Sequence, residues 1–491
     1  MELDWLLAPP LPEAMPRQRL LYHRLRDAIL SGRLAPATRL PASRALADSL
    51  GIARNTVLFA YEQLTAEGCL VADRQGTRVA PLAALGAAAD APAQRGPAPP
   101  SPGLSARAEI ARQPAVVPHA PPLPFSPGIP DYGPFPFRAW RGCLERAWQE
   151  VSWRELGYTA HGGDPALRRE LAAHLTTVRG LPVAAEQIVI TSGTQSGLDL
   201  CARFLADAGH TAWLENPGYQ AARIAWSLAG LALHDVAVDE AGMAPTSADW
   251  TERPPRLILL TPSHQYPTGR VMPLGRRLDL IEQARQAGAW IVEDDYESEF
   301  RRAGPAPPAL FGLQEEAPVV YVGTFSKTLY PGLRLGYLVL PRGIAAAFAL
   351  AAAQTTRAGQ GIEQRALADF IRRGHYTAHL RRMRARYAAR QAALRAALKA
   401  EFGSDVALSG GEAGLHLAMW LPDMCSDQRV AHAAAALGLG VRALSSYTRS
   451  PMRCNGLVLG YGNLAEGMLD EAVRRLGDAV RTATAQPPDA R

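Results

Sequence analysis

The sequence predicts an α/β protein in two unequal parts, a small helical head that ends in a β-hairpin and a large α/β body. Three observations predict this organisation. An Ala/Pro-rich linker at 81–122 is expected, because 24 of the 44 residues from Pro81 to Pro124 are alanine or proline and such chain resists helix and sheet. The head, 1–80, carries successive helical patterns. The body, 123–491, alternates β-branched runs with helical stretches.

The composition is typical of a soluble, multidomain, cytoplasmic protein. The chain has 491 residues, of which 48% are hydrophobic, ample for a real core. Its uncharged apolar runs are too short to span a bilayer, and its first residues lack the basic-then-apolar order of a signal peptide. The five cysteines are widely spaced without a CxxC pair, which argues against a disulfide framework and a zinc site. We therefore expect no membrane association and no bound metal.

The head should contain three helices followed by two short strands. Ser43 suits a helix N-cap, and the glycine at position 51 marks a turn between the second and third helices. A polar turn, 73–76, separates two apolar runs and favours a hairpin. The expected elements are helices over Leu20–Leu30, Ser43–Leu50 and Arg54–Glu67, and strands over 68–72 and 77–80.

This order of elements is the plan of a winged helix-turn-helix, which binds double-stranded DNA. The start of such a recognition helix lies against base edges in the major groove, where arginine reads guanine and asparagine reads adenine. Arginines around the second helix could hold phosphates, and an arginine on the wing could reach a neighbouring groove. A small protein-interaction domain with a solvated basic face is the alternative. The residues expected to contact DNA are Arg39, Ser43, Arg44, Arg54, Asn55, Thr56 and Arg74.

The run from Leu40 to Val57 resembles the head of GntR-type regulators. Two positions depart from that family's pattern. Ala37 stands where glycine is usual, and Ala53 where a serine usually precedes the arginine. Losing that serine removes a potential phosphate contact, so Ser43 and Thr56 become the expected carriers.

Lys327 is the most informative residue of the body. Of the 52 basic residues only Lys327 and Lys399 are lysines, and forming an imine with an aldehyde is chemistry that arginine cannot supply. Lys327 follows the predicted strand Val319–Val322, at the end of the strand where ligands gather in open α/β sheets. Lys399 lies in an Arg/Ala-rich helical stretch and is explained by a solvated helix face.

Polar residues follow other predicted strands. The turn after Gln187–Thr191 opens a helix and offers free N–H groups to an anion, although such turns are also common without a ligand. The acidic run Glu293–Tyr296 follows the strand 290–292; it could hold a metal, but no other metal-ligand cluster accompanies it. His264 follows Leu257–Leu260 and either faces a cofactor or has a structural role. A last strand is expected over Leu335–Leu340.

Together these parts describe a site for pyridoxal 5'-phosphate (PLP). Lys327 would be the catalytic residue and bind the aldehyde as an imine. Asp294 would pair with the pyridinium nitrogen, Tyr296 would hydrogen-bond the ring hydroxyl, and Tyr219 would stack on the ring. The expected phosphate cradle comprises Gly193, Thr194, Gln195, Thr324, Ser326 and Arg334. Their order and spacing resemble fold-type-I aminotransferases, with Tyr-Pro-Thr-Gly at 266–269 in place of the usual Asn-Pro-Thr-Gly.

The order of head, linker and body resembles the MocR-type regulators, and the motifs at 263–269, 293–300 and 323–334 look like that family specifically. The resemblance implies a homodimeric, PLP-dependent transcriptional regulator that senses PLP or an amine or amino-acid effector through its body. A catalytically active aminotransferase with an appended DNA-binding head is the alternative. A PLP-storage or scaffold protein without DNA activity is a third hypothesis.

One departure favours sensing over turnover. Amino-acid aminotransferases of this kind usually carry an arginine for the substrate carboxylate in a late strand, and Val458 stands in its place here. Without that clamp a substrate is poorly oriented, and orientation is a large part of the rate. Arg449 or Arg453 could substitute from nearby.

Overall fold

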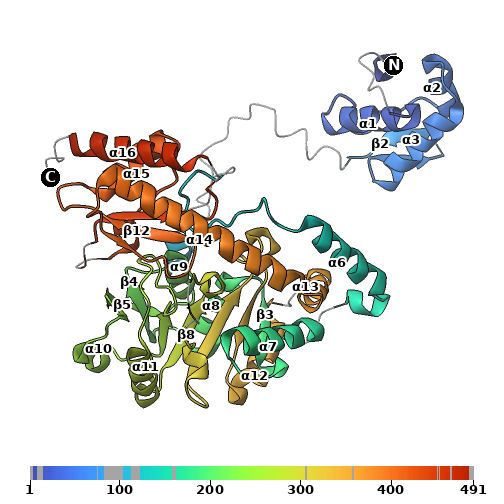
Figure 1. The fold of residues 1–491 in the computed structure, drawn as a ribbon. Coiled ribbons are helices and arrows are strands. Elements are labelled where there is room, and N and C mark those ends of the chain that lie inside the picture. The colour runs from blue at the N-terminus through green and yellow to red at the C-terminus, as the bar shows by residue number, and fades with distance from the viewer. Residues whose placement is uncertain are drawn as a thin grey trace. The chain divides into compact units, whose positions relative to one another are not determined.

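The computed structural model divides the chain into two compact units, Met1–Gly103 and Leu104–Arg491, shown in Figure 1. It describes residues 4–7, 15–74, 76–81, 103–111, 122–157, 162–302, 304, 307–356, 359–449, 452, 454–464 and 467–485. Most of the predicted linker, the turn residue Gln75 and Arg453 lie outside these residues. No helix among those described is long and apolar enough to cross a membrane.

The first unit has the helices and the hairpin that the sequence predicts. Its elements are η1 (Asp4–Leu7), α1 (Arg17–Leu30), α2 (Ser43–Leu50), α3 (Arg54–Ala66), β1 (Leu70–Asp73) and β2 (Gly76–Val79), with β1 antiparallel to β2. The residues expected to face inward are buried: Leu21, Leu25, Ala28, Ile29, Val57, Tyr61 and Leu64. The three helices therefore share one small core with the first strand.

The predicted N-cap of α2 is wrong. Ser43 is the first helical residue, and Ala42 occupies the cap position without a side-chain hydrogen bond. The Ser43 hydroxyl instead accepts a hydrogen bond from Nε of Arg54 at 3.3 Å. Because this bond joins the starts of α2 and α3, the serine orders the helix-turn-helix rather than the helix end.

A short helix lies where the sequence predicted only extended linker. Helix α5 (Ala106–Ala111) belongs to the second unit and packs against α9 (Gln220–Leu228). The segment between Pro102 and Pro114 contains no proline and is rich in alanine, so nothing in it blocks a helix. The averaged composition of the linker concealed this stretch.

The second unit is built on an eight-stranded sheet with the order β3-β10-β9-β8-β7-β4-β5-β6. The strands are β3 (Ile188–Thr191), β4 (Thr211–Asn216), β5 (Ala232–Asp239), β6 (Gly242–Met243), β7 (Leu257–Leu260), β8 (Trp290–Asp295), β9 (Val319–Thr324) and β10 (Gly336–Val339). Strands β8 and β9 run further than predicted, through the acidic residues in one case and to Thr324 in the other, because the added residues are buried and paired.

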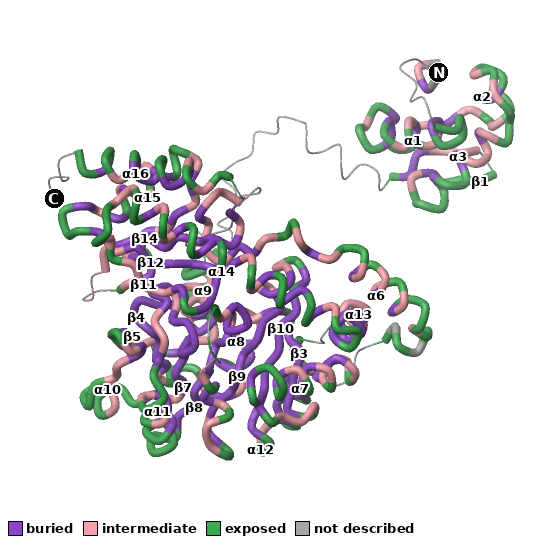
Figure 2. Tube along the Cα trace, viewed as in Figure 1, coloured by how far each residue is buried: buried purple, intermediate pink, exposed green. Residues whose placement is uncertain are grey.

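Helices cover both faces of this sheet, as expected for a largely parallel sheet. Alternate residues of β9 divide between the two sides: Val320 and Val322 pack with α8 (Thr194–Leu205) and α12 (Arg342–Thr356), whereas Val319 and Tyr321 pack on the other side. The further helices are α6 (Phe137–Glu150), α7 (Pro165–Arg179), α10 (Ser247–Glu252), α11 (Leu274–Ala287), α13 (Gly361–Arg372) and α14 (His375–Phe402). Buried chain accordingly follows the strands in Figure 2.

A second, smaller sheet completes the unit. It has the order β11-β12-β14-β13 and comprises β11 (Leu408–Ser409), β12 (His416–Trp420), β13 (Arg442–Ala443) and β14 (Gly456–Gly460). Helices α15 (Asp427–Ala436) and α16 (Leu469–Ala485) pack on it. This sheet matters for function because β12 brings His416 towards the end of β8.

Candidate cofactor and DNA sites

The strand directions place the predicted body residues at one edge of the large sheet. Strands β3 and β9 are both antiparallel to β10, so they run parallel to each other, and β9 runs parallel to β8. Gly336 pairs with both Thr191 and Thr324. The carboxyl ends of β3, β8 and β9 therefore lie together, as the sequence predicted for a ligand site.

Lys327 lies three residues beyond β9 and is half-buried. Its Nζ donates a hydrogen bond to the carbonyl oxygen of Gly128 at 2.7 Å, from the segment that precedes α6. Burial lowers the pKa of the Lys327 amine, although the carboxylates of Glu297 and Asp294 act in the opposite direction. A lowered pKa increases the fraction of neutral amine, which is the form that attacks a carbonyl carbon.

Asp294 differs from its two acidic neighbours because side chains alternate along β8. Asp295 forms a buried ion pair with Arg179 at 2.6 Å, and Glu293 accepts two backbone N–H groups. Asp294 points the other way, and its Oδ1 has no hydrogen-bond partner among the described residues. Burial and the charge of Asp295 raise the pKa of Asp294 to about 7, while Lys327 acts to lower it. This carboxyl group therefore lacks a cationic or donor partner.

Part of the predicted phosphate cradle also comes together. Gly193 has φ 89° and precedes the first turn of α8, where Thr194 is the first helical residue. The Arg334 guanidinium donates to the Ser192 carbonyl at 3.1 Å. A Cβ added at Gly193 would lie 3.3 Å from that guanidinium, so a side chain there would crowd the arginine. A helix N-terminus and an arginine thus face the same space.

The other cradle residues are engaged within the protein. The Thr324 hydroxyl accepts from the backbone N–H of Ser326 at 3.2 Å, which shapes the loop between β9 and Lys327. Gln195 donates through Nε2 to the Ala221 carbonyl at 2.7 Å, so its amide links α8 to α9. The Gln195 Oε1 atom is buried without a partner among the described residues.

The two predicted ring-contacting tyrosines lie at the same edge. Tyr296 follows β8 and donates its hydroxyl to the His264 carbonyl at 2.9 Å. Tyr219 stands before α9 with 36% of its surface exposed, and its ring meets that of Tyr266 edge to face at 5.9 Å. Tyr219 therefore offers an accessible aromatic face, whereas the Tyr296 hydroxyl already has an acceptor.

These residues fit PLP. The cofactor presents a ring nitrogen, an aldehyde and a phosphate. The described residues offer a buried carboxyl oxygen without a partner, at Asp294, an amine of lowered pKa, at Lys327, and a helix N-terminus next to Arg334. Each group that the cofactor needs is matched at one sheet edge.

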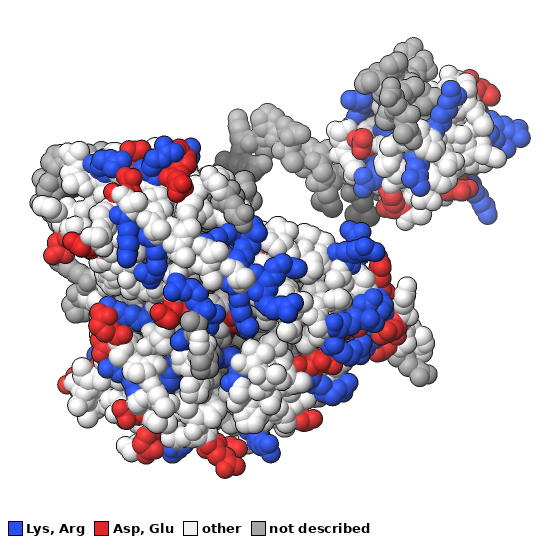
Figure 3. Space-filling model, in the orientation of Figure 1, with Lys and Arg blue, Asp and Glu red and all other residues white. Residues whose placement is uncertain are grey.

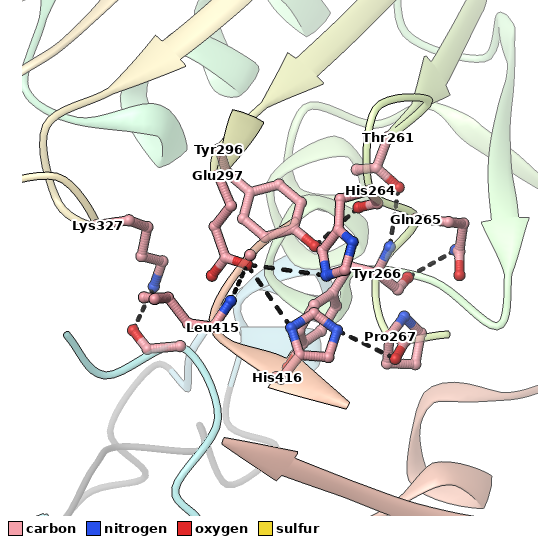
Figure 4. A network of polar contacts seen from close by, with 12 residues as sticks. Thr261, His264, Gln265, Tyr266, Pro267, Tyr296, Glu297, Lys327, Leu415 and His416 are labelled. Atoms are coloured by element: carbon pink, nitrogen blue, oxygen red, sulfur yellow. Dashed lines mark hydrogen bonds and ion pairs between the residues drawn. The ribbon is translucent and has the colours of Figure 1, made fainter. Parts of the chain in front are cut away.

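Several residues of this edge were missed by sequence reasoning. Gly128 is the hydrogen-bond partner of Lys327, and Glu297 lies between Lys327 and the imidazoles of His264 and His416 in Figure 4. Buried Glu215 accepts from the Thr261 hydroxyl at 2.5 Å. The run Glu-Ser-Glu after Tyr296 is a signal that could have singled out Glu297, but nothing local in the sequence pairs it with residues of a second sheet.

The structure gives the late-strand departure a physical setting. Val458 lies in β14, is fully buried, and packs with Leu444, Tyr447 and the partly buried Tyr266. Arg449 is exposed and donates to the Gln220 side chain at 3.2 Å. The place where an arginine clamp was expected is therefore apolar.

In the first unit, the predicted DNA-contacting residues lie on the surface. Arg54 and Asn55 are exposed at the start of α3, and Arg44 is exposed in α2. Arg39 is exposed and forms an antiparallel bridge with Arg78 of the hairpin, while Arg74 is exposed at the hairpin turn. Basic side chains project from the face of this unit that Figure 3 shows.

Comparison with known proteins identifies both parts. Residues 17–79 match the family of bacterial regulatory proteins of the gntR type, and residues 135–446 match aminotransferase class I and II. The probable rhizopine catabolism regulatory protein MocR of Rhizobium meliloti is 37% identical over 95% of this chain and 94% of its own length. The chain belongs to the MocR-type transcriptional regulators.

Other similarities agree with this family. The pyridoxine biosynthesis transcriptional regulator PdxR of Corynebacterium glutamicum is 32% identical over 98% of this chain and 99% of its own length. The crystal structure of LysN, an α-aminoadipate aminotransferase from Thermus thermophilus, aligns with a TM-score of 0.66 at 28% identity, over 74% of this chain and 93% of LysN. This MocR-type regulator thus combines a GntR-type DNA-binding head with a fold-type-I aminotransferase-like body, as predicted.

Proposed function

We propose that this regulator binds PLP at Lys327 and senses an amine-bearing effector there, and that occupancy of the site changes how paired heads bind DNA. The observation that carries the proposal is the pairing of Lys327 with Asp294 at one sheet edge. The amine has a lowered pKa, and the buried carboxyl has a raised pKa and an oxygen without a partner in the described chain.

PLP supplies an aldehyde that reacts with amines and a ring that accepts electrons. Lys327 would hold the aldehyde carbon through Nζ. Asp294 would accept a proton-bearing ring nitrogen and so regain the charge that burial disfavours. The first turn of α8 with Arg334 would bind the phosphate, and Tyr219 would cover the ring. Tyr296 would serve the ring hydroxyl only by exchanging its present acceptor, the carbonyl of His264.

The same geometry supports sensing rather than sustained transamination. Binding a carboxylate requires a cation at the late strand, and buried Val458 with its aromatic neighbours supplies none. An effector amine can still compete with Lys327 for the aldehyde. Its binding would change regulation only to the extent that it favours one arrangement of the heads over another.

Spectroscopy on lysine variants tests the cofactor site. The wild type should develop the visible absorption of protein-bound PLP, and Lys327→Ala should lose it. Lys399→Ala is the matched control, because it removes the other lysine from the end of α14 and should leave the absorption unchanged. Equal absorption in all three proteins would reject the assignment of Lys327.

DNA binding and turnover test the regulatory role. Mobility shifts on the upstream region should show sequence preference and weaken steeply with salt. An amine that alters the shift of the wild type should have no effect on Lys327→Ala. Repeated transfer from an amino acid to an oxo acid would instead favour the aminotransferase alternative. Analytical ultracentrifugation tests whether the protein is the homodimer that paired heads require.

A further inference from the structure

Three buried side chains converge beside the Lys327 pocket and have no role in the function proposed above. His264 follows β7, Glu297 follows β8 and His416 begins β12, and each is at most 2% exposed. One side-chain nitrogen or oxygen atom from each lies within 4.8 Å of the other two. Residues from two different sheets therefore point at one small volume, as Figure 4 shows.

The contacts among these side chains are too long to be hydrogen bonds. Oε2 of Glu297 lies 3.7 Å from Nδ1 of His416 and 4.0 Å from Nε2 of His264. Both nitrogens of His264, Nδ1 of His416 and Oε1 of Glu297 lack a hydrogen-bond partner among the described residues. Buried polar atoms without partners are costly, so the spacing indicates that the three groups share a ligand.

The protonation of the cluster points to a cation. Nε2 of His416 lies 3.2 Å from the Pro267 carbonyl, an acceptor, so this nitrogen carries the hydrogen. In a neutral ring Nδ1 then presents a lone pair towards Glu297. Burial lowers the pKa of His264 to about 3, which keeps that ring neutral too. A carboxylate would thus face two lone pairs, an arrangement that a cation stabilises.

The backbone leaves room for these atoms to meet. A Cβ added at Gly414 would lie 2.3 Å from Oε2 of Glu297 and 2.6 Å from Nε2 of His264. The adjacent backbone N–H, of Leu415, donates to the same Oε2 at 2.9 Å and orients the carboxylate. The hydrogen bond of His416 to a backbone carbonyl is likewise the outer contact that fixes ligating histidines.

We propose that His264, Glu297 and His416 form a binding site for a divalent transition metal, with Zn²⁺ as the best match. Two histidines and one glutamate are a known zinc ligand set that leaves a fourth position open. Nitrogen and oxygen donors without thiolate also disfavour softer ions. An ion here ties β12 of the small sheet to the ends of β7 and β8, next to Lys327.

Zinc binding to the untagged, full-length protein tests the site. After chelation and gel filtration, the wild type should take up one zinc per chain by mass spectrometry of the metal, with or without PLP. Glu297→Gln and His416→Gln should each bind zinc at least about tenfold more weakly in a chelator competition, as even the loss of an outer contact costs that much. His379→Gln, which removes another buried histidine, should bind as the wild type does.

Two further measurements protect this test from misfolding and from thiols. Gly414→Ala leaves all three ligands in place but fills their meeting point, so it should also weaken zinc binding. Co²⁺ should give the absorption of a nitrogen and oxygen site without thiolate charge transfer, although the five cysteines are free. Zinc uptake that is equal in wild type and ligand variants, no uptake in the wild type, or a thiolate spectrum would each overturn the proposal. The PLP absorption is independent of these results.

Discussion

The head and the body place their functional residues in opposite environments. In the head, Arg54 and Asn55 follow one another in sequence and stand exposed on one helix. In the body, Lys327 and Asp294 come from different strands and lie at a buried edge. Exposed charges act on a partner through water and are screened by salt, whereas buried charges alter one another's pKa. The head should therefore tolerate substitutions that the body does not.

The largest expected difference concerns the buried ion pair of the body. Arg179→Ala leaves Asp295 buried without its cation, which should lower the free energy of unfolding by about 3–5 kcal/mol. Denaturation followed by tryptophan fluorescence measures this, since Trp213 is fully buried in the body. The double variant Arg179→Ala, Asp295→Asn should recover part of the loss. If it recovers none, the arginine stabilises the body through packing rather than charge.

The next largest effect is on DNA affinity and belongs to the head alone. Replacing both Arg54 and Asn55 by alanine should weaken specific binding roughly 100-fold, because each base contact is worth about 1–3 kcal/mol. Mobility shifts measure the affinity. The absorption of bound PLP should stay unchanged. A loss of both properties would mean that the two parts are not independent.

A pH-dependent effect should separate Asp294 from any head carboxylate. Its raised pKa, to about 7, means that the folded protein binds a proton more tightly than the unfolded chain does. Its contribution to stability therefore falls as pH rises from about 4 to 7. Asp294→Asn should remove this dependence and stabilise the PLP-free protein by a few kcal/mol above pH 7. Unfolding titrations of both proteins at pH 5 and 8 check the sign.

The smallest expected effect is at an exposed ion pair of the head. Arg26 lies 3.2 Å from Glu67, and both side chains are more than a third exposed. Arg26→Ala should change stability by less than about 1 kcal/mol, and less still in high salt. A larger change, measured by unfolding of the isolated signal of the head, would contradict the contrast drawn between the two regions.

Local features were predictable from the sequence. The helices of the head follow from apolar spacing, and α2 has the predicted bounds, Ser43–Leu50. Lys327 stood out because arginine could not replace it chemically. These signals depend on neighbouring residues, so they are visible without tertiary structure.

Features that depend on distant contacts were not predictable. Ser43 was expected at the helix cap, but its hydroxyl accepts from Arg54 in the next helix. The acidic run was treated as one cluster, although the alternation of β8 sends Asp294 away from its neighbours. No bound metal was expected because ligands were sought close together in sequence. His264 and His416 meet Glu297 only through the packing of two sheets.

The hydrogen bond from Lys327 to Gly128 acquires a consequence from its position in the chain. The segment 122–128 is the first part of the body after the linker, and its residues Pro124 and Phe125 are held by backbone N–H groups of the small-sheet region. A lysine nitrogen bound to a cofactor carbon has fewer hydrogens left to donate, so the Gly128 carbonyl must find another donor. A chemical change at the lysine is therefore also a change at the attachment point of the linker.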